Sequence, residues 1–303
     1  MKILVTGGAG FIGSHTCDKL LEHGADVCVM DDFSHGKKEY VPGGAYVYEA
    51  DIRDGGAVEK IFAAEKFDAV AHLAAQIKVP ASVADPVKDA QINVIGSINL
   101  LEAARKTGVK KFIYAASAAI FGEPEYLPID EEHPLNMISG YGVSKHAVEH
   151  YLRVYNKLYG LGYNILRYSN VFGPRQDATG EGGVVAIFSE AFAEGRTPVV
   201  FGDGEQVRDF VYVKDVAAAN LLALNSEKNG IYNVCTGEQI TVNCLVDAFN
   251  IIYGKNVKPK YDKPREGDIV VSYMTYEKIF NEMGWKPTYA FIDALRETAA
   301  YYG

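Results

Sequence analysis

Hydrophobic and polar positions alternate in two patterns along the first two-thirds of the chain. Short, continuous apolar runs are typical of strands buried on both faces of a parallel sheet. Longer segments between them carry apolar residues at helical spacing. The runs lie at residues 3–5, 27–30, 69–72, 111–115 and 163–166, and the helical segments at 11–23, 58–66, 87–106 and 141–159. This alternation predicts right-handed βαβ crossovers and an α/β fold, a doubly wound parallel sheet.

The pattern changes near Asn170, where loops rich in glycine and proline separate shorter elements. We therefore expect residues 1–169 to form the main domain, with segments near 207–235 returning to it. Residues 170–303 should form mainly a smaller C-terminal α/β lobe. We find no internal repeat, low-complexity tract or linker, so the chain should have no freely jointed parts.

A glycine motif, TGGAGFIGS at residues 6–14, lies between the first predicted strand and the first predicted helix. Gly7, Gly10 and Gly13 have the spacing for a tight turn, close approach of the backbone to a pyrophosphate, and close packing of helix on strand. Gly8 with Gly10 and Gly13 satisfies the alternative form of the motif. A helix N-terminus at this point favours an anion. The motif alone also suits a plain strand–helix turn, so its context decides.

Asp31 and Asp32 end the second apolar run, 18 residues after Gly13. An acidic side chain here accepts hydrogen bonds from the ribose hydroxyls of a dinucleotide and repels a 2′-phosphate. We assign this role to Asp31 and predict NAD rather than NADP, which makes residues 1–169 a Rossmann NAD-binding domain. Asp51 and Ile52 would flank the adenine, although a strand end with a solvated aspartate is an equally good interpretation of them.

Tyr141 and Lys145 form a Y-x-x-x-K motif, which places both side chains on one face of a predicted helix. The preceding apolar run ends at Ala115, Ala116 and Ser117, where a doubly wound sheet presents its ligand crevice. A phenol is a poor base at neutral pH unless its anion is stabilised. A lysine ammonium about 5 Å away supplies roughly 3 kcal/mol at an effective dielectric of 20, or about two pKa units. Tyr141 is therefore a candidate general base.

At this point the sequence resembles the extended short-chain dehydrogenase/reductase family, and within it the nucleotide-sugar 4-epimerases of the UDP-glucose 4-epimerase type. The resemblance spans nearly the whole chain. It rests on the segments at residues 6–14, 31–34, 51–53, 72–75, 93, 117–122, 141–145, 167–175, 202–204, 208–210 and 265–268.

The resemblance implies a redox-neutral reaction on a tightly held NAD. Tyr141 takes the proton of the sugar 4-hydroxyl while a hydride passes from C4 to the nicotinamide, and the 4-keto sugar turns and takes the hydride back. Ser117 would bind the 4-oxygen, and Lys145 would hold the nicotinamide ribose and lower the pKa of Tyr141. The cofactor contacts implied are Gly7, Gly10, Phe11, Ile12, Gly13, Asp31, Asp32, Phe33, Ser34, Gly36, Asp51, Ile52, Leu73, Ala74, Ala75, Asn93, Tyr141, Lys145 and Tyr168.

The same resemblance implies that the C-terminal lobe binds the UDP-sugar substrate. Arg208 and Arg265 would contact the diphosphate or its ribose, in agreement with the match between a guanidinium and phosphate oxygens. The implied substrate contacts are Ser117, Asn170, Val184, Phe201, Arg208, Arg265 and Asp268. Counting seven residues beyond Arg265 reaches Ser272, where a small side chain would admit N-acetylhexosamines as well as hexoses.

Three features depart from the family pattern. Ser139 and Gly140 stand where Ser-Pro is common, which predicts a looser start to the catalytic helix. Ala115 and Ala116 replace serines before Ser117. Ala119 replaces a frequent threonine and removes one hydrogen bond to the substrate or tyrosine.

Other activities of the same family are the first alternative. A dehydratase, a uronate epimerase or a decarboxylase would use the same scaffold, but the dehydratases need an Asp-Glu pair after Ser117, where this chain has Ala118 and Ala119. A remote alternative is a zinc hydrolase, because His146, Glu149 and His150 match H-x-x-E-H on a helix. We predict no metal, because no third ligand motif accompanies them. An NAD-sensing protein would usually lack the tyrosine or the lysine, and a serine hydrolase would need a G-x-S-x-G turn around Ser117.

Composition excludes several other classes. The chain has 303 residues and a formal net charge of −9, which disfavours a nucleic-acid binder but not an anionic small substrate. Its four scattered cysteines are typical of reduced thiols in a cytoplasmic protein. No apolar run approaches the roughly 20 residues of a membrane span, so we expect no membrane partner. The family resemblance implies a homodimer through residues 87–106 and 141–159.

Overall fold

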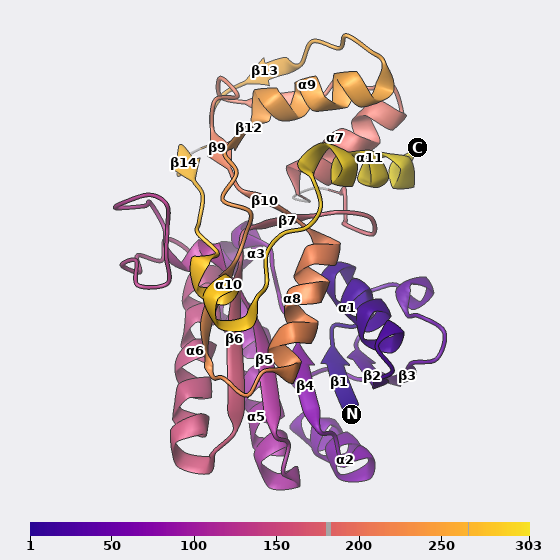
Figure 1. Ribbon diagram of the computed structural model, residues 1–303, viewed down its shortest axis with the longest axis vertical. Coiled ribbons are helices and arrows are strands. Elements are labelled where there is room, and N and C mark those ends of the chain that lie inside the picture. Colours follow the sequence, from indigo (N-terminus) through magenta and orange to yellow (C-terminus); the bar gives the residue numbers. More distant parts are fainter. Residues whose placement is uncertain (180–182, 266) are drawn as a thin grey trace. The chain divides into compact units, whose positions relative to one another are not determined.

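The computed structural model describes residues 1–179, 183–265 and 267–303, which divide into two compact units (Figure 1). Unit 1 comprises Met1–Gly122, Leu135–Arg167 and Ala217–Tyr232, and unit 2 comprises Glu123–Pro134, Tyr168–Val216 and Asn233–Gly303. The sequence placed residues 123–134 in the first domain, but they belong to unit 2. Ile129 exchanges backbone hydrogen bonds with Tyr273 and Thr275 and accepts one from the Asn233 amide, which holds this segment there. The segment that returns to unit 1 is 217–232, shorter than the predicted 207–235.

A seven-stranded sheet of order β11-β6-β5-β4-β1-β2-β3 forms the centre of unit 1. The strands are β1 (Lys2–Thr6), β2 (Asp26–Asp31), β3 (Tyr46–Glu49), β4 (Ala69–His72), β5 (Lys111–Ser117), β6 (Gly162–Tyr168) and β11 (Gly230–Val234). β1 pairs in parallel with β2 and β4, and so do β2 with β3 and β4 with β5. This confirms the predicted doubly wound parallel sheet. The apolar pattern did not predict β3, because this edge strand leaves most of its side chains exposed.

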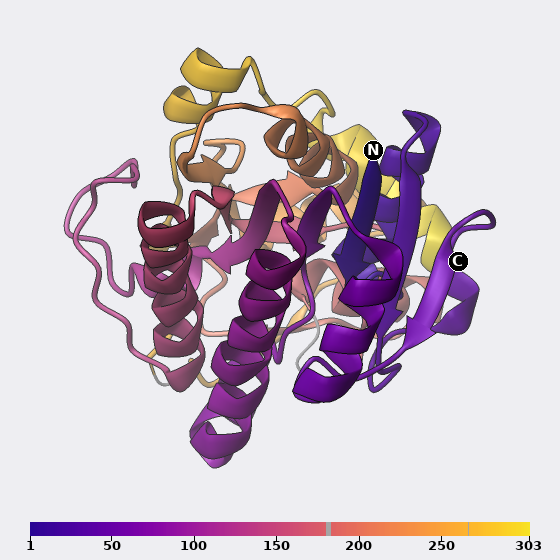
Figure 2. The ribbon, with the colours of Figure 1, turned by 90° about the horizontal axis from the view of Figure 1, so that it is seen from below.

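Helices cover both faces of this sheet, as its continuous apolar strands require. They are α1 (Phe11–Glu22), α2 (Gly55–Glu65), α3 (Val79–Ala84), α4 (Pro86–Ala90), α5 (Gly96–Thr107), α6 (Gly140–Tyr159) and α8 (Val213–Asn225), with short helical turns at η1 (Lys38–Tyr40) and η3 (Ala118–Ile120). Figure 2 shows α5 and α6 on one face and α8 on the other. On the α8 face, Asn220 of α8 donates a hydrogen bond to Thr16 of α1 (2.9 Å).

The predicted helix 87–106 is interrupted. α4 ends at Ala90, a π-helical turn follows at Gln91–Ile95 (η2), and α5 begins at Gly96. Such π turns occur frequently at functional sites because the extra residue redirects the side chains that follow. Asp89 and Asn93 are buried polar side chains of this segment.

Unit 2 is built from short strand pairs and packed helices. Its strands are β7 (Asn170–Phe172) beside β10 (Phe210–Tyr212), β9 (Val207–Arg208) between β12 (Ile240–Thr241) and β14 (Val271–Ser272), and β8 (Val199–Phe201) beside β13 (Lys260–Asp262). Its helices are α7 (Val184–Ala193), α9 (Val242–Tyr253), α10 (Glu277–Met283) and α11 (Phe291–Tyr302). Phe192 stacks on Phe249 (5.2 Å between centroids) and on Tyr253 (5.7 Å), which joins α7 to α9.

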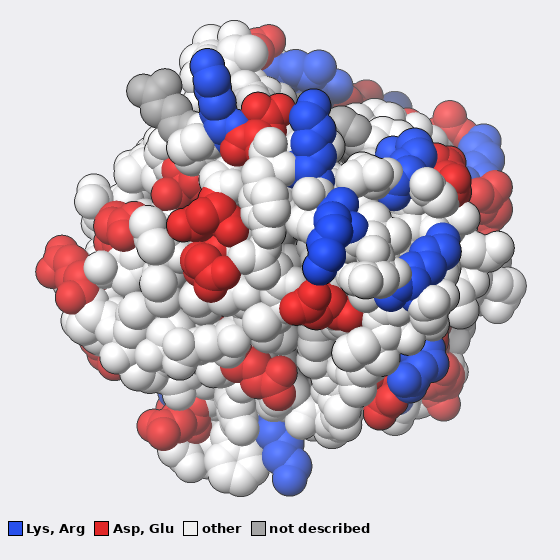
Figure 3. All heavy atoms as spheres, turned by 90° about the horizontal axis from the view of Figure 1, so that it is seen from above, with Lys and Arg blue, Asp and Glu red and all other residues white. Residues whose placement is uncertain are grey.

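The sequence analysis expected no nucleic-acid partner and no membrane partner. Lys and Arg side chains are interspersed with Asp and Glu on the face drawn in Figure 3, without a broad basic patch there. Among the described residues, no helix combines the length and the apolar content needed to cross a membrane. Cys17, Cys28 and Cys235 are buried, and Cys244 is exposed.

Candidate functional site

The glycine motif lies at the point where the strand order of unit 1 reverses, between β1 and β4. Gly7 follows β1 with φ +69°, and a Cβ there would lie 2.7 Å from the Ala74 nitrogen after β4. A Cβ at Gly13 would lie 2.0 Å from the Gly7 oxygen. Only glycine therefore allows this turn, and ligands of doubly wound sheets bind at such switch points.

The N-terminus of α1 is suited to an anion. Gly10 is its N-cap without a side-chain hydrogen bond, and no acidic residue lies in the first turn, which contains Phe11 and Ile12. The positive end of the helix dipole is thus not neutralised by a carboxylate. This arrangement fits a pyrophosphate.

Asp31 is held at the end of β2 by the glycine loop. Its carboxylate accepts hydrogen bonds from the backbone N–H groups of Ala9 and Phe33, both at 2.9 Å. Burial raises the pKa of Asp31, and these N–H groups act against the rise. A Cβ at Gly36 would lie 2.8 Å from Asp31 Oδ1, so Gly36 leaves room for the carboxylate. The residues present therefore fit the adenosine half of NAD.

The remaining predicted cofactor residues lie in several environments. Asp32 accepts from Ser34 N (2.9 Å) and Ser34 Oγ (2.6 Å). Asp51 is paired with Arg53, whose hydrogen bonds lower the pKa of the Asp51 carboxyl. Ile52 is buried. Among the others, Leu73, Ala74 and Ala75 follow β4 in unit 1, whereas Tyr168 ends β6 and belongs to unit 2.

The side-chain amide of Asn93 is hydrogen-bonded to protein groups through both its oxygen and its nitrogen. Its Oδ1 accepts from Gln76 N (2.8 Å), and its Nδ2 donates to Gln76 O (3.0 Å), Asp89 Oδ1 (3.1 Å) and Ser144 Oγ (3.0 Å). Asn93 thus ties the loop after β4 to α6.

The three predicted catalytic residues come from the carboxyl end of β5 and the first turns of α6. The Ser117 side chain faces the Tyr141 phenol and acts to lower its pKa. Lys145 Nζ lies 6.0 Å from the centre of the Tyr141 ring and donates to the Ala115 carbonyl (3.0 Å). The structure therefore brings Ser117, Tyr141 and Lys145 together within unit 1.

Burial is the largest influence on the pKa values of Tyr141 and Lys145. Desolvation raises the pKa of Tyr141 and lowers the pKa of Lys145 to about 8. The sequence argument expected the lysine to lower the pKa of the tyrosine. Burial outweighs any such effect, and the interaction with Ser117 acts against burial by lowering the pKa of Tyr141.

The start of α6 is better defined than the sequence indicated. Ser139 caps the helix by accepting from Gly142 N (3.1 Å), which satisfies a first-turn donor. Gly140 packs so closely on α3 that a Cβ there would lie 3.0 Å from the Ser82 oxygen. The prediction of a looser start was therefore wrong, because a glycine without a side chain here permits close packing on α3.

The glutamate of the H-x-x-E-H segment, Glu149, forms an ion pair with Arg167. Both oxygens of Glu149 accept from the Arg167 guanidinium (3.0 and 2.9 Å), and both residues are buried. His146 also binds Glu149, and the His146 and His150 rings contact each other (2.9 Å between nitrogens). The described residues contain no group of three or more His, Cys, Asp or Glu side chains suited to a metal ion. Arg167 and His146 thus occupy both oxygens of the glutamate in this motif.

In unit 2 the predicted substrate residues form two pairs. Arg208 Nη2 donates to Asp268 Oδ1 (2.5 Å), and the Arg265 guanidinium lies 4.3 Å from the centre of the Phe201 ring. Ser272 lies opposite Arg208 in the register of β14 with β9. The other predicted contacts lie elsewhere in unit 2, with Asn170 at the start of β7 and Val184 at the start of α7. Glu266 of the resembling segment lies outside the described residues.

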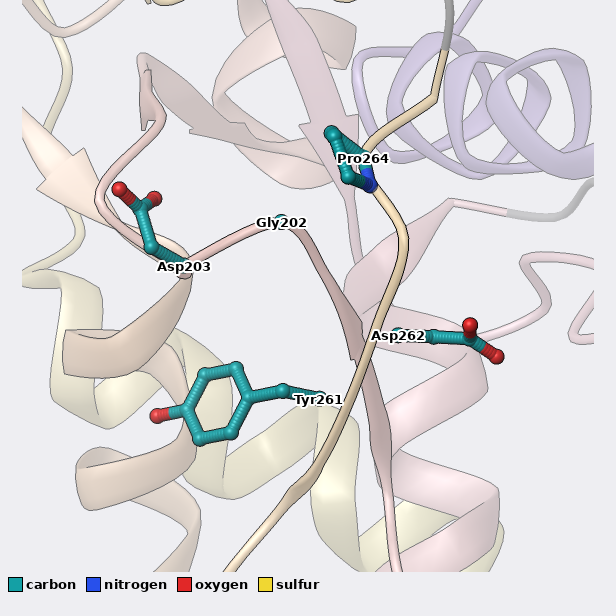
Figure 4. Close-up of a pocket in the computed structure, with 5 residues that line it drawn as sticks. All are labelled: Gly202, Asp203, Tyr261, Asp262 and Pro264. Carbon is teal, nitrogen blue, oxygen red and sulfur yellow. The ribbon is translucent and has the colours of Figure 1, made fainter.

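An open hollow of about 620 Å³ lies next to the Phe201–Arg265 pair, between the ends of β8 and β13. Its lining residues are Gly202, Asp203, Tyr261, Asp262 and Pro264 (Figure 4). Gly202 follows Phe201 and Pro264 precedes Arg265 in the chain. The hollow and the arginine therefore share the same two segments.

Sequence reasoning missed a polar group under the catalytic helix. Asp89, Gln76 and Ser144 join Asn93 in a hydrogen-bonded cluster, and Asp89 is 2% exposed. Asp89 lies four residues before Asn93, which is the only signal in the sequence. A single aspartate in an amphipathic helix normally indicates the solvent face, so the signal was too weak.

Comparison with known proteins gives one consistent family. The sequence model of the NAD dependent epimerase/dehydratase family matches residues 3–235. The structure of UDP-glucose 4-epimerase from Thermotoga maritima, solved with UDP-glucose, is 46% identical with a TM-score of 0.97, covering 100% of this chain and 98% of that one. UDP-glucose 4-epimerase from Thermus thermophilus, solved with NAD, is 44% identical (TM-score 0.94; coverage 100% and 99%). UDP-N-acetylglucosamine 4-epimerase from Methanobrevibacter ruminantium M1, in complex with UDP-N-acetylmuramic acid, is 37% identical (TM-score 0.95; coverage 99% and 97%).

Proposed function

The chain belongs to the NAD dependent epimerase/dehydratase family, and we propose that it catalyses the 4-epimerisation of a UDP-hexose through a transient 4-keto intermediate. The substrates are UDP-glucose and UDP-galactose. The observation that carries this proposal is the Ser117–Tyr141–Lys145 arrangement at the carboxyl end of β5. The similarity to 4-epimerases over the whole chain supports it.

NAD is the cofactor in this proposal, and it accepts a hydride from C4 of the sugar and returns it to the opposite face. Gly7, Gly10 and Gly13 give the pyrophosphate access to the N-terminus of α1, and Asp31 binds the adenosine ribose. The carboxylate of Asp31 would repel a 2′-phosphate, which favours NAD over NADP.

The chain itself moves one proton and orients the reacting oxygen. The Ser117 hydroxyl binds the 4-oxygen, and Tyr141 takes the proton of the 4-hydroxyl and later returns it. The Lys145 ammonium and the positive end of α6, where Tyr141 is the second residue, favour the phenolate. No side chain with an acidic proton occupies the turn after Ser117, where η3 carries Ala118 and Ala119. This supports epimerisation over a dehydratase or decarboxylase activity, and a uronate epimerase is the remaining alternative.

Unit 2 supplies the contacts to the UDP moiety in this proposal. Arg208 and Arg265 bind the diphosphate or its ribose through charge-assisted hydrogen bonds, and Asp268 orients Arg208. Asn170, Val184 and Phe201 complete the substrate contacts. The small side chain of Ser272, adjacent to Arg208 in the sheet, leaves room for a 2-N-acetyl group. UDP-N-acetylhexosamines should therefore be substrates as well.

We also propose a homodimer in the cytoplasm. Exposed apolar side chains recur on one face of α6 at Val143, Tyr151, Val154 and Leu158, and such a face favours burial against a second copy. Val154→Glu should shift the sedimentation coefficient from dimer to monomer. Ile251→Glu, at an exposed position of α9 in unit 2, should leave it unchanged. The four scattered cysteines suit a reducing compartment.

The decisive experiment is incubation of the purified protein with UDP- and dTDP-sugars without added cofactor, with the products identified by NMR. We expect interconversion of UDP-glucose and UDP-galactose, and of UDP-GlcNAc and UDP-GalNAc, without a change in mass. A product lighter by water or carbon dioxide would establish an alternative activity. Turnover of the hexoses alone would refute the role given to Ser272.

A further inference from the structure

Asp89 is a buried carboxylate close to the catalytic residues. It lies on α4, and its Oδ1 accepts hydrogen bonds from Gln76 Nε2 (2.7 Å) and Asn93 Nδ2 (3.1 Å). Burying a carboxylate is costly even when neutral amides bind it. This cost raises the question of what the charge does here.

The hydrogen bonds of Asp89 continue to the first turn of α6. Asn93, four residues later across the π-helical turn, donates to Ser144 Oγ (3.0 Å). Ser144 Oγ in turn donates to the Tyr141 carbonyl (3.1 Å). Ser144 directly precedes Lys145 in the chain. The cluster therefore connects Asp89 to the backbone that carries both catalytic side chains.

The charge of Asp89 also reaches the buried groups around this turn. It raises the pKa of Lys145 and of Tyr141, and it acts in the same direction on Tyr114 of β5. The other groups facing Lys145 are the Tyr114 ring, 5.0 Å away, and the imidazole of His72 on β4, whose pKa Lys145 lowers. Ser117 faces Tyr141 from β5. Asp89 is the acidic group that acts on both members of the pair.

We propose that Asp89 is a positioning residue of the catalytic pair. Its Oδ1 fixes Gln76 and Asn93, so that Asn93 holds Ser144 and the first turn of α6. Its negative charge keeps Lys145 an ammonium inside the buried site. This role rests on the proposed function of Tyr141 and Lys145, which it deepens.

Asp89→Asn separates the two contributions, because both observed hydrogen bonds reach the same oxygen. An asparagine Oδ1 in that position accepts from Gln76 and Asn93 as before, and only the charge is lost. Asp89→Ala removes the charge and both acceptors. Asp85→Asn is the matched control, since Asp85 lies on the same segment but is exposed and only caps α4 by accepting from Lys88 N (2.9 Å).

The first measurement is the pH profile of kcat for the holoenzyme. Loss of the charge lowers the pKa of both Tyr141 and Lys145, so Asp89→Asn should move the acid and the alkaline limbs together toward lower pH by about one unit. Asp89→Ala should show the same shift and a larger fall in kcat. Asp85→Asn should leave both limbs in place. Unchanged limbs in Asp89→Asn would overturn the electrostatic role, since a purely structural residue changes the height of the profile.

The second measurement does not require turnover. NMR of isotope-labelled tyrosine, with the Tyr141 resonance identified by its loss in Tyr141→Phe, follows the phenol directly. We expect Tyr141 to titrate at lower pH in Asp89→Asn than in the wild-type protein, and an identical titration would refute the proposal. If the wild-type protein does not epimerise UDP-sugars, the proposed function fails, whereas this titration still decides the role of Asp89. The titration of Tyr141 in Asp89→Asn also decides the role of Asp89 if Asp89→Ala does not fold.

Discussion

The two units hold their functional side chains in opposite physical states. In unit 1, Lys145 is buried and donates to a backbone carbonyl, and Tyr141 has its pKa raised by desolvation. In unit 2, Arg208 and Arg265 lie on a short strand and a loop, and the side chains of the Arg208–Asp268 ion pair are 16% and 34% exposed. Unit 1 thus buries the groups that we propose to move a proton, whereas the ion pair that we propose to meet the diphosphate is partly exposed.

The two units differ in the free energy that their functional side chains cost the folded state. Burying the Tyr141 phenol and the Lys145 ammonium costs free energy of folding. The packing of α6 against the sheet of unit 1 keeps both side chains in place. A partly exposed ion pair contributes little to stability. Changes in unit 1 should therefore act on kcat, and changes in unit 2 on KM.

The largest effect is expected for Tyr141→Phe. Loss of the acid–base group should lower kcat by about 10³-fold, while bound NAD and the fold are retained, because the glycine loop and Asp31 are unaffected. The absorbance of the bound cofactor measures the retention of NAD, and the turnover of UDP-galactose measures kcat. Tyr151→Phe removes a hydroxyl from an exposed position of the same helix and should keep full activity. Near-normal turnover in Tyr141→Phe would remove this residue from the mechanism.

The next effect concerns unit 2. Arg208→Gln should raise KM for a UDP-sugar by about 10²-fold, corresponding to a charge-assisted hydrogen bond of roughly 2–3 kcal/mol, with a much smaller change in kcat. Steady-state kinetics at varied substrate separate these constants. The control is Arg196→Gln, an exposed arginine of the same unit that pairs with Glu190. A fall in kcat at unchanged KM would contradict the division between the units.

A smaller effect is expected from the buried imidazole of unit 1. His72 lies between Thr6 Oγ1 (2.7 Å) and Ser97 Oγ (2.8 Å), and burial lowers its pKa to about 3. Since the pKa is depressed in the folded state, its stabilisation is complete above the unfolded value near 6.5 and is lost as pH falls from there toward 3. The loss is about 1.4 kcal/mol of unfolding free energy per pH unit.

Urea unfolding between pH 7 and pH 4 tests this dependence. His72→Gln should show a shallower slope, and His23→Gln, at an exposed position, should keep the slope of the wild-type protein. An equal slope in all three proteins would show that other groups control the acid stability of unit 1.

The smallest effect compares one kind of helix cap in the two units. Ser139 caps α6 in unit 1, and Thr241 caps α9 in unit 2 by accepting from Cys244 N (3.0 Å). Ser139→Ala and Thr241→Ala should each lower the free energy of unfolding by about 1 kcal/mol. Only Ser139→Ala should also lower kcat, because α6 carries Tyr141 in its first turn. Equal kinetics for both variants would show that this first turn is held by Asn93 and Ser144 alone.

The sequence predicted most of the sheet of unit 1 and its longest helices, because each depends on residues adjacent in the chain. Continuous apolar runs marked five strands within two residues of their ends. It did not predict β3, whose side chains are mostly exposed, or the π-helical turn within residues 87–106. Both depend on neighbours that are distant in the chain.

By itself, the sequence determined the positions of chemistry that require a local pattern. The glycines after β1 and the four-residue spacing of Tyr141 and Lys145 follow from the geometry of one turn and one helix. Tertiary structure alone decided which charges are buried. It joined Asp89 to Asn93 and Glu149 to Arg167 in the interior of unit 1. It also made desolvation the main influence on the pKa of Tyr141. Burial is a property of the whole fold, so no spacing along the chain reveals it.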